Sequence, residues 1–288
     1  MSITTSGAAA GRGTGVVIDD DGRILTNEHV VSGAATVTVE LATGRTAQAT
    51  VLGTDPSTDL ALLQVDVPAD ELEPIPLGDS GELAVGDPVL AIGDPFGYEG
   101  SASVGIVSGL GRTIEAPNGF SITGAVQTDA AVNYGNSGGA LLNAAGELIG
   151  VPAQIADSGV EGNVGVAFAV PADTAQQVIS DLSEDGEVEH AWLGVATEDA
   201  GTGGGGARVT GLVTGGPAVD AGLTCGDRVT AVGETKVADS TGLQEAVDAE
   251  RPGAEVALRV SGAGGGDRTV HVTLGERPAS VQAATSCA

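Results

Sequence analysis

The chain has 288 residues, 41% hydrophobic and 17% charged, which is typical of an ordered globular protein with one to three domains. Its net charge of −28 argues against binding to nucleic acid or to anionic membranes. No apolar run approaches the roughly 18–20 residues that a membrane-spanning helix needs.

The surface charge and the cysteines also bear on the environment of the protein. With Lys236 as the only lysine, the acidic composition predicts adaptation to high salt, since the Debye length falls to about 3 Å in molar salt. Cys225 and Cys287 lack metal-site spacing, so we expect two free thiols, with a single bridge between this loop and the tail as the alternative. We expect no metal and no cofactor. The N-terminus has no apolar core of a signal peptide, so the protein is either cytoplasmic or exported with a missing segment.

The first part of the chain contains strands joined by short turns. Residues 16–18 and 23–26 flank an acidic turn, and His29 directly follows the second strand. There are three histidines. His190 lies in an acidic linker and His271 in an alternating strand, where we expect both to face solvent. His29 is therefore the candidate general base.

Asp59 is the candidate partner for His29. It immediately precedes the apolar run 60–63, where a carboxylate must be hydrogen-bonded to be tolerated. Taken alone, Asp59 could equally cap a turn. Asp55 and Asp66 are expected to be solvated turn residues.

Ser137 lies in the sequence GNSGG (135–139). Glycines let the backbone bend so that its N–H groups face a developing oxyanion, although a plain turn is the alternative. An α/β-hydrolase would place a helix after the serine and its histidine later in the chain. Residues 140–142 and 147–151 instead predict a β-hairpin, and the order His, Asp, Ser favours the chymotrypsin-type arrangement.

The rest of the chain contains a helix and a second module. Residues 171–185 predict a helix with an apolar stripe of Ala175, Val178, Ile179 and Leu182. From 191 to 277 the pattern by itself indicates only an α+β module. A helix opening at 240–241 would be capped by Thr241 and Gln244.

The segments LTNEHVV around His29, TDLALLQV at Asp59 and QTDAAVNYGNSGGAL around Ser137 together resemble the HtrA (Deg) family of serine endopeptidases. GDPFGY (93–98), GIVSGLGR (105–112) and GVAFAVP (165–171) resemble further family segments in the same order, from Gly13 to about Gly275. The resemblance implies a mainly β fold. Its parts are a chymotrypsin-like double β-barrel over 1–183 divided near 66–86, an acidic linker (184–190), a PDZ domain (191–277) and a tail (278–288).

The resemblance also implies the roles of individual residues. His29 would be the general base, Asp59 its orienting partner and Ser137 the nucleophile, with an oxyanion hole formed by the N–H groups of Gly135 and Ser137. The specificity pocket maps onto Ala131 and the segment 163–168, which includes Val164, Gly165, Val166 and Phe168. These apolar residues predict cleavage after small to medium aliphatic residues and not after Lys or Arg.

In the second module, Trp192, Leu193, Gly194 and Val195 match the family's carboxylate-binding loop, and residues 216–233 match the signature that follows it. Such a loop captures a C-terminal carboxylate, and the peptide joins the sheet as a strand. The helix after 240 would present Leu243, Ala246 and Val247 to the peptide groove.

The resemblance has departures. The segment before Gly13 is short, so we expect much of the opening strand of the first barrel to be missing. The family's trimer contacts use N-terminal aromatic residues, and aromatics make up 2% of this chain, so a trimer is not predicted and a homo-oligomer is left open. Pro152 falls where the family continues a polar strand near the substrate.

The predicted function is an ATP-independent serine endopeptidase of protein quality control, which hydrolyses unfolded or damaged proteins and binds C-terminal peptides at its PDZ domain. The alternative is a PDZ-bearing chaperone or scaffold with little proteolysis. The intact set of His29, Asp59 and Ser137 counts against that alternative.

Overall fold

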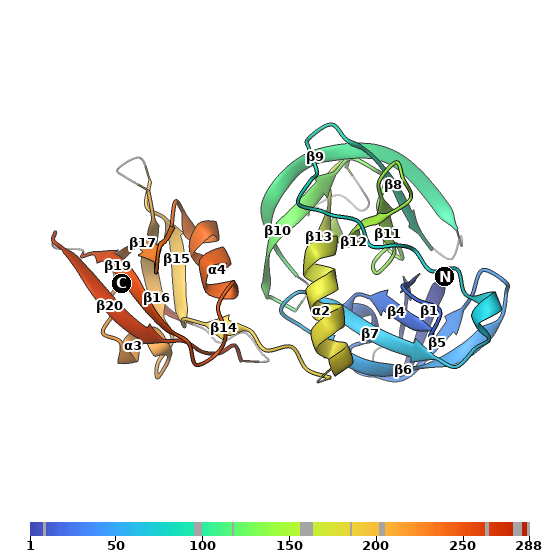
Figure 1. Ribbon diagram of the computed structural model, residues 1–288, viewed down its shortest axis with the longest axis horizontal. Helices are drawn as coiled ribbons and strands as arrows, with labels where there is room; N and C mark the ends of the chain where they lie inside the picture. The colour runs from blue at the N-terminus through green and yellow to red at the C-terminus, as the bar shows by residue number, and fades with distance from the viewer. Residues whose placement is uncertain are drawn as a thin grey trace. The chain divides into compact units, whose positions relative to one another are not determined.

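The chain folds into two compact units, Met1–Val188 and Glu189–Ala288, both built mainly of strands (Figure 1). The structure is a computed structural model that describes residues 1–7, 10–94, 100–116, 118–155, 164–184, 186–201, 205–262, 265–278 and 284–286, with the backbone alone for 154 and 155. The predicted mainly β fold is confirmed.

The first half of the larger unit is a seven-stranded antiparallel sheet in the order β2-β1-β5-β6-β7-β4-β3. Its strands are β1 (Ser2–Gly7), β2 (Gly11–Thr14), β3 (Val16–Val17), β4 (Arg23–Thr26), β5 (Ala34–Glu40), β6 (Thr46–Asp55) and β7 (Leu60–Val65). A one-turn helix, α1 (Glu28–Val31), follows β4. The expectation that much of the opening strand is missing is wrong, because β1 pairs with β5 from Ser2 to Gly7 and with β2 from Ser2 to Thr5.

The second half of this unit is a closed barrel in the order β10-β13-β12-β11-β8-β9. A connection with one short 3-10 turn (Ala69–Glu71) leads into it. Its strands are β8 (Pro88–Gly93), β9 (Ser101–Glu115), β10 (Ser121–Thr128), β11 (Ala140–Leu142), β12 (Leu148–Ile155) and β13 (Ala167–Pro171). β11 and β12 pair as the hairpin predicted after Ser137.

The helix α2 (Ala172–Glu184) joins the two halves of the larger unit. It contacts β6 and β7 of the sheet and β12 and β13 of the barrel, as Figure 1 also shows. The predicted stripe is confirmed, since Ala175, Val178, Ile179 and Leu182 are buried in a core shared by both halves. Each buried aliphatic side chain contributes about 1.5–3 kcal/mol, so the helix fixes the two halves that flank the candidate active site.

The smaller unit is a sheet in the order β15-β16-β17-β19-β20, with β18 on β17 and β22 on β16, and a separate pair of β14 and β21. Helix α4 packs against β14 to β17, and the one-turn α3 packs against β20. The elements are β14 (Ala191–Trp192), β15 (Val195–Asp199), β16 (Ala207–Leu212), α3 (Pro217–Asp220), β17 (Arg228–Val232), β18 (Thr235–Lys236), α4 (Ser240–Asp248), β19 (Glu255–Ser261), β20 (Asp267–Thr273), β21 (Gly275–Glu276) and β22 (Thr285–Ser286). No helix among the described residues is both long and apolar enough to span a bilayer.

Three local expectations are wrong. Asp55 is only 2% exposed, because its carboxylate accepts hydrogen bonds from the Ser57 N–H and the Thr58 hydroxyl within the turn. Helix α4 is capped by Asp239, whose carboxylate accepts the Gly242 N–H at 2.8 Å, and not by a Thr241–Gln244 box. Cys225 is disulfide-bonded and is not a free thiol; Cys287 lies outside the described residues.

Candidate active site

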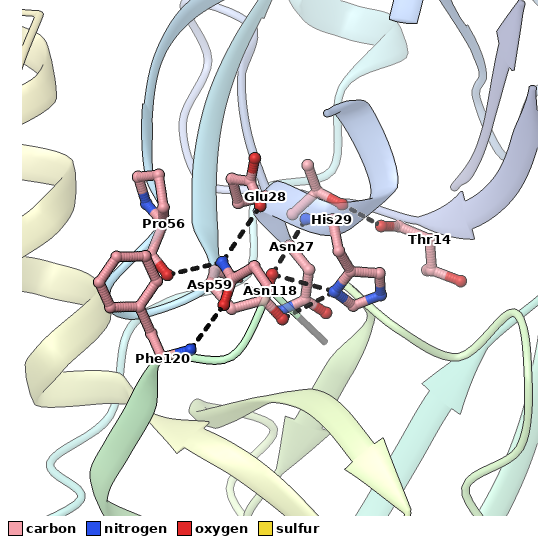
Figure 2. A network of polar contacts seen from close by, with 9 residues as sticks. Thr14, Asn27, Glu28, His29, Pro56, Asp59, Asn118 and Phe120 are labelled. Carbon is pink, nitrogen blue, oxygen red and sulfur yellow. Dashed lines mark hydrogen bonds and ion pairs between the residues drawn. The ribbon is translucent and has the colours of Figure 1, made fainter. Parts of the chain in front are cut away.

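His29, in α1, and Asp59, directly before β7, form a hydrogen-bonded pair (Figure 2). The Asp59 carboxylate is fully buried and lies 2.7 Å (Oδ2) and 3.0 Å (Oδ1) from His29 Nδ1. Its Oδ1 also accepts the His29 backbone N–H at 2.9 Å. A carboxylate at Nδ1 assigns the imidazole proton to that nitrogen and leaves Nε2 as the free base.

The backbone of Asp59 is held in an uncommon conformation. Its φ of 58° makes it the only non-glycine residue with positive φ in the part of the chain that the structure describes. Its carbonyl oxygen accepts hydrogen bonds from Asn27 Nδ2 at 2.8 Å and the Glu28 N–H at 3.0 Å. Such strained residues persist where the surrounding contacts fix them, and they cluster at functional sites. Asn27 and Glu28 therefore set the direction from which Asp59 meets His29.

Sequence reasoning missed Asn118, which connects the barrel to the sheet beside this pair (Figure 2). It lies in the turn between β9 and β10. Its Nδ2 donates to the Pro56 carbonyl at 2.8 Å and lies 3.5 Å from Glu28 Oε2, while its Oδ1 accepts the Phe120 N–H at 3.1 Å. No local motif marks this residue, because all of its partners on the sheet are distant in sequence.

The turn that carries Ser137 is held by bonds to its carbonyl oxygens. The Ser137 carbonyl accepts the Thr14 N–H at 2.9 Å, and the Asn136 carbonyl accepts the Gly139 N–H at 2.9 Å. Gly138 donates its N–H to the Pro152 carbonyl at 3.0 Å, which places Pro152 beside this turn. By contrast, the N–H groups of Gly135 and Ser137 donate to no other described residue, so both are available to an anion.

The segments that carry Ser137 and His29 are connected through Thr14. The Thr26 hydroxyl, on the strand that leads to His29, donates to the Thr14 carbonyl at 2.7 Å, and Thr14 in turn holds Ser137. Within the described residues no hydrogen bond joins the Ser137 hydroxyl to His29. Catalytic hydrogen bonds are often long before substrate binds.

The other candidate residues of the larger unit lie along the barrel. Val164 is 51% exposed, whereas Phe168 is partly buried against the shared core. Ala131 is exposed, and its carbonyl accepts the Ser103 hydroxyl at 2.9 Å. Gly165 and Val166 lead into β13, and Asn163 lies outside the described residues. A pocket formed by these residues stays a prediction.

In the smaller unit, the loop Trp192–Val195 leads into β15, an edge strand of the sheet. The Leu193 and Gly194 N–H groups donate to no described residue. The Trp192 ring packs near Gly194 and Gly216. Leu243 and Val247 are only 3% and 5% exposed, because α4 packs its apolar face onto the sheet. Both belong to the hydrophobic core of this unit, and their contact with a peptide stays a prediction.

The structure also separates the candidate histidines. His190 and His271 belong to the smaller unit, whereas Asp59 and Ser137 belong to the larger one. After Ser137 the chain enters β11 and not a helix, which removes the α/β-hydrolase alternative.

Comparison with known proteins finds a family match for each unit. Residues 13–151 match the family described as "Trypsin-like peptidase domain", and residues 191–274 match "PDZ domain". The chain is 42% identical to "Serine protease PepD" of Mycobacterium tuberculosis over 296 residues, covering 96% of this chain and 63% of that protein. A "Probable periplasmic serine endoprotease DegP-like" of Halomonas elongata is 42% identical over 282 residues, covering 94% and 58%.

The chain thus spans about three fifths of the length of these curated relatives. Among solved structures, "HtrA-type protease AlgW with tripeptide" superimposes with a TM-score of 0.85 at 34% identity, covering 96% of this chain and 93% of that one. The same protease "with decapeptide" gives a TM-score of 0.80 at 35% identity. Because this likeness extends over both units, the chain belongs to the HtrA-type serine proteases, with a trypsin-like peptidase domain followed by a PDZ domain.

Proposed function

We propose that this chain is an ATP-independent endopeptidase that hydrolyses unfolded or damaged proteins, with His29 as the general base, Asp59 as its orienting partner and Ser137 as the nucleophile. The observation that carries the proposal is the fully buried Asp59 carboxylate 2.7 Å from His29 Nδ1. A buried carboxylate on Nδ1 both selects the reactive tautomer and stabilises the imidazolium that forms.

In the proposed reaction, His29 Nε2 takes the hydroxyl proton as Ser137 Oγ attacks the substrate carbonyl carbon. The imidazolium then gives this proton to the amine nitrogen as the C–N bond breaks, which leaves an ester on Ser137. Water attacks the ester and transfers a proton to His29, and the same proton returns to Ser137 Oγ when the acid product leaves.

The tetrahedral intermediate needs donors for its oxyanion. The N–H groups of Gly135 and Ser137 suit this role, because neither donates to another described residue. Each such donor contributes on the order of 10²–10³ in rate.

Substrate selection would involve both units. Ala131, Val164, Gly165, Val166 and Phe168 would favour a small aliphatic side chain before the cleaved bond, by roughly 10–200-fold per methylene. A C-terminal carboxylate would bind the N–H groups of the 192–195 loop, and the peptide would extend β15. Leu243 and Val247, which are nearly covered in the structure, would contact the side chains of that peptide.

Two observations support a proposal about the compartment. The relative from Halomonas elongata is named a probable periplasmic endoprotease, and Cys225 is disulfide-bonded. Disulfides persist in oxidising compartments. We therefore propose that the protein works outside the cytoplasm.

The test compares the wild-type chain with Ser137→Ala on one protein substrate, in its folded and its unfolded form, without ATP. We expect the wild type to cleave the unfolded form, with cuts mainly after Val, Ala or Thr, and Ser137→Ala to be inactive. Suppression of aggregation without cleavage by the wild type would support the chaperone or scaffold alternative. Equal binding of a C-terminal peptide and its amidated form would contradict the role of the 192–195 loop.

A further inference from the structure

Thr14, a residue of the first sheet, forms hydrogen bonds to two residues of the Ser137 turn, and no sequence motif predicts them. It ends β2 and is only 4% exposed. Its side-chain hydroxyl lies 2.7 Å from the Gly135 carbonyl oxygen and 2.9 Å from the Asp94 backbone nitrogen. Its backbone N–H holds the Ser137 carbonyl. One residue thus bonds to both positions of the proposed oxyanion hole.

The direction of each hydrogen bond is fixed by its partners. The Asp94 N–H can only donate, so the Thr14 hydroxyl accepts there, and the Gly135 carbonyl can only accept, so the hydroxyl proton points at it. The resulting chain runs from the Asp94 N–H through the Thr14 hydroxyl to the Gly135 carbonyl. Bonds in such a chain polarise one another.

Gly135 is a flexible point of this turn, and the bond from Thr14 limits its freedom. Its φ is 101°, a conformation that glycine adopts and leaves freely. The Thr14 hydroxyl is its only hydrogen-bond partner among the described residues. The Asn136 N–H, at the other end of the same peptide group, donates to the Asn133 carbonyl, so the Thr14 hydroxyl and Asn133 together set the plane of that peptide.

We propose that Thr14 is a positioning residue for the proposed reaction: its hydroxyl holds the Gly135 carbonyl, which restricts rotation at the Gly135 Cα and so helps to keep the N–H on the other side of that Cα directed at the oxyanion. This inference rests on the proposed function. It assigns Thr14 no contact with the substrate. Its effect should therefore appear in kcat and not in KM, because the oxyanion exists only in the transition state and the intermediates that flank it.

The experiment compares Thr14→Val, which keeps the shape and removes the hydroxyl, with Thr14→Ser, which keeps the hydroxyl. Thr5→Val is the matched control. Thr5 is also 4% exposed, and its hydroxyl bonds to the backbone of Gly11, on the adjacent strand β2. The readouts are kcat and KM on a peptide amide, the melting temperature, and the inhibition constant of a peptide aldehyde, whose adduct oxygen occupies the oxyanion hole.

We expect Thr14→Val to lose roughly 10–100-fold in kcat, less than the loss of a donor itself, with KM nearly unchanged. Aldehyde inhibition should weaken by a similar factor, and Thr14→Ser should stay within about threefold of the wild type. If Thr14→Val does not fold, Thr14→Ala carries the same test.

Three results overturn the inference: a Thr14→Val enzyme with kcat within about threefold of wild type, an equal loss in Thr5→Val, or a Thr14→Ser enzyme as slow as Thr14→Val. A wild type that hydrolyses no peptide overturns the proposed function itself, and the inference with it.

Discussion

Replacing Asp59 by asparagine tests the orientation of His29 without changing the size of the side chain. In the structure, Asp59 Oδ1 accepts the His29 N–H at 2.9 Å, and Oδ2 lies 2.7 Å from Nδ1. An asparagine has only one acceptor oxygen, which the backbone N–H requires. Its NH₂ group would then face Nδ1 and donate to it. The imidazole would carry its proton on Nε2, where a base needs a free lone pair.

The expected loss follows from this change of tautomer. The same substitution in a chymotrypsin-like protease lowers kcat by about 10⁴. We expect a similar loss here, equivalent to about 5 kcal/mol of transition-state stabilisation. The assay is kcat on a peptide amide near neutral pH, with the melting temperature measured alongside. A folded Asp59→Asn enzyme within about tenfold of the wild type would refute the reasoning.

Three further predictions concern stability. Gly138→Ala should cost about 2–6 kcal/mol, because φ is +79° and a Cβ would overlap the Thr26 hydroxyl; an unchanged urea midpoint would contradict this. Burial would raise the pKa of Asp227, but hydrogen bonds from Arg268 and Thr224 outweigh it and hold the pKa below its ordinary value. The stabilisation from the ionised carboxylate is present above the unfolded pKa of about 3.9 and is lost as pH falls through the folded pKa. Asp227→Asn should therefore lower the free energy of unfolding by about 1–3 kcal/mol near pH 7 and by much less near pH 2. A decrease in the free energy of unfolding that does not depend on pH would contradict this prediction. With a net charge of −28, the melting temperature should rise from tens of millimolar to molar KCl, as the Debye length falls toward about 3 Å; a flat or falling curve would contradict salt adaptation.

The parts of the fold and site that could be predicted are those with a local signal. The stripe of α2 follows from helical spacing, and the hairpin after Ser137 follows from two apolar runs around an Asn and Gly turn. His29 could be singled out because there are only three histidines. The burial of Asp59 could be expected because an apolar run follows it directly.

The remaining features depend on contacts between distant segments. Thr14 reaches Gly135 across 121 positions, and Asn118 reaches Glu28 across 90. Neither residue type is unusual in a strand or a turn, so no pattern in the sequence marks them.

The central claim is that Ser137 is activated by His29, and covalent labelling tests it most directly. The full chain would be treated with a fluorophosphonate, and the adduct located by digestion and mass spectrometry. We predict a single adduct on Ser137, absent in Ser137→Ala and formed far more slowly in His29→Ala, while His190→Ala and His271→Ala react like the wild type. An adduct on another serine, or labelling at an unchanged rate in His29→Ala, would contradict the account.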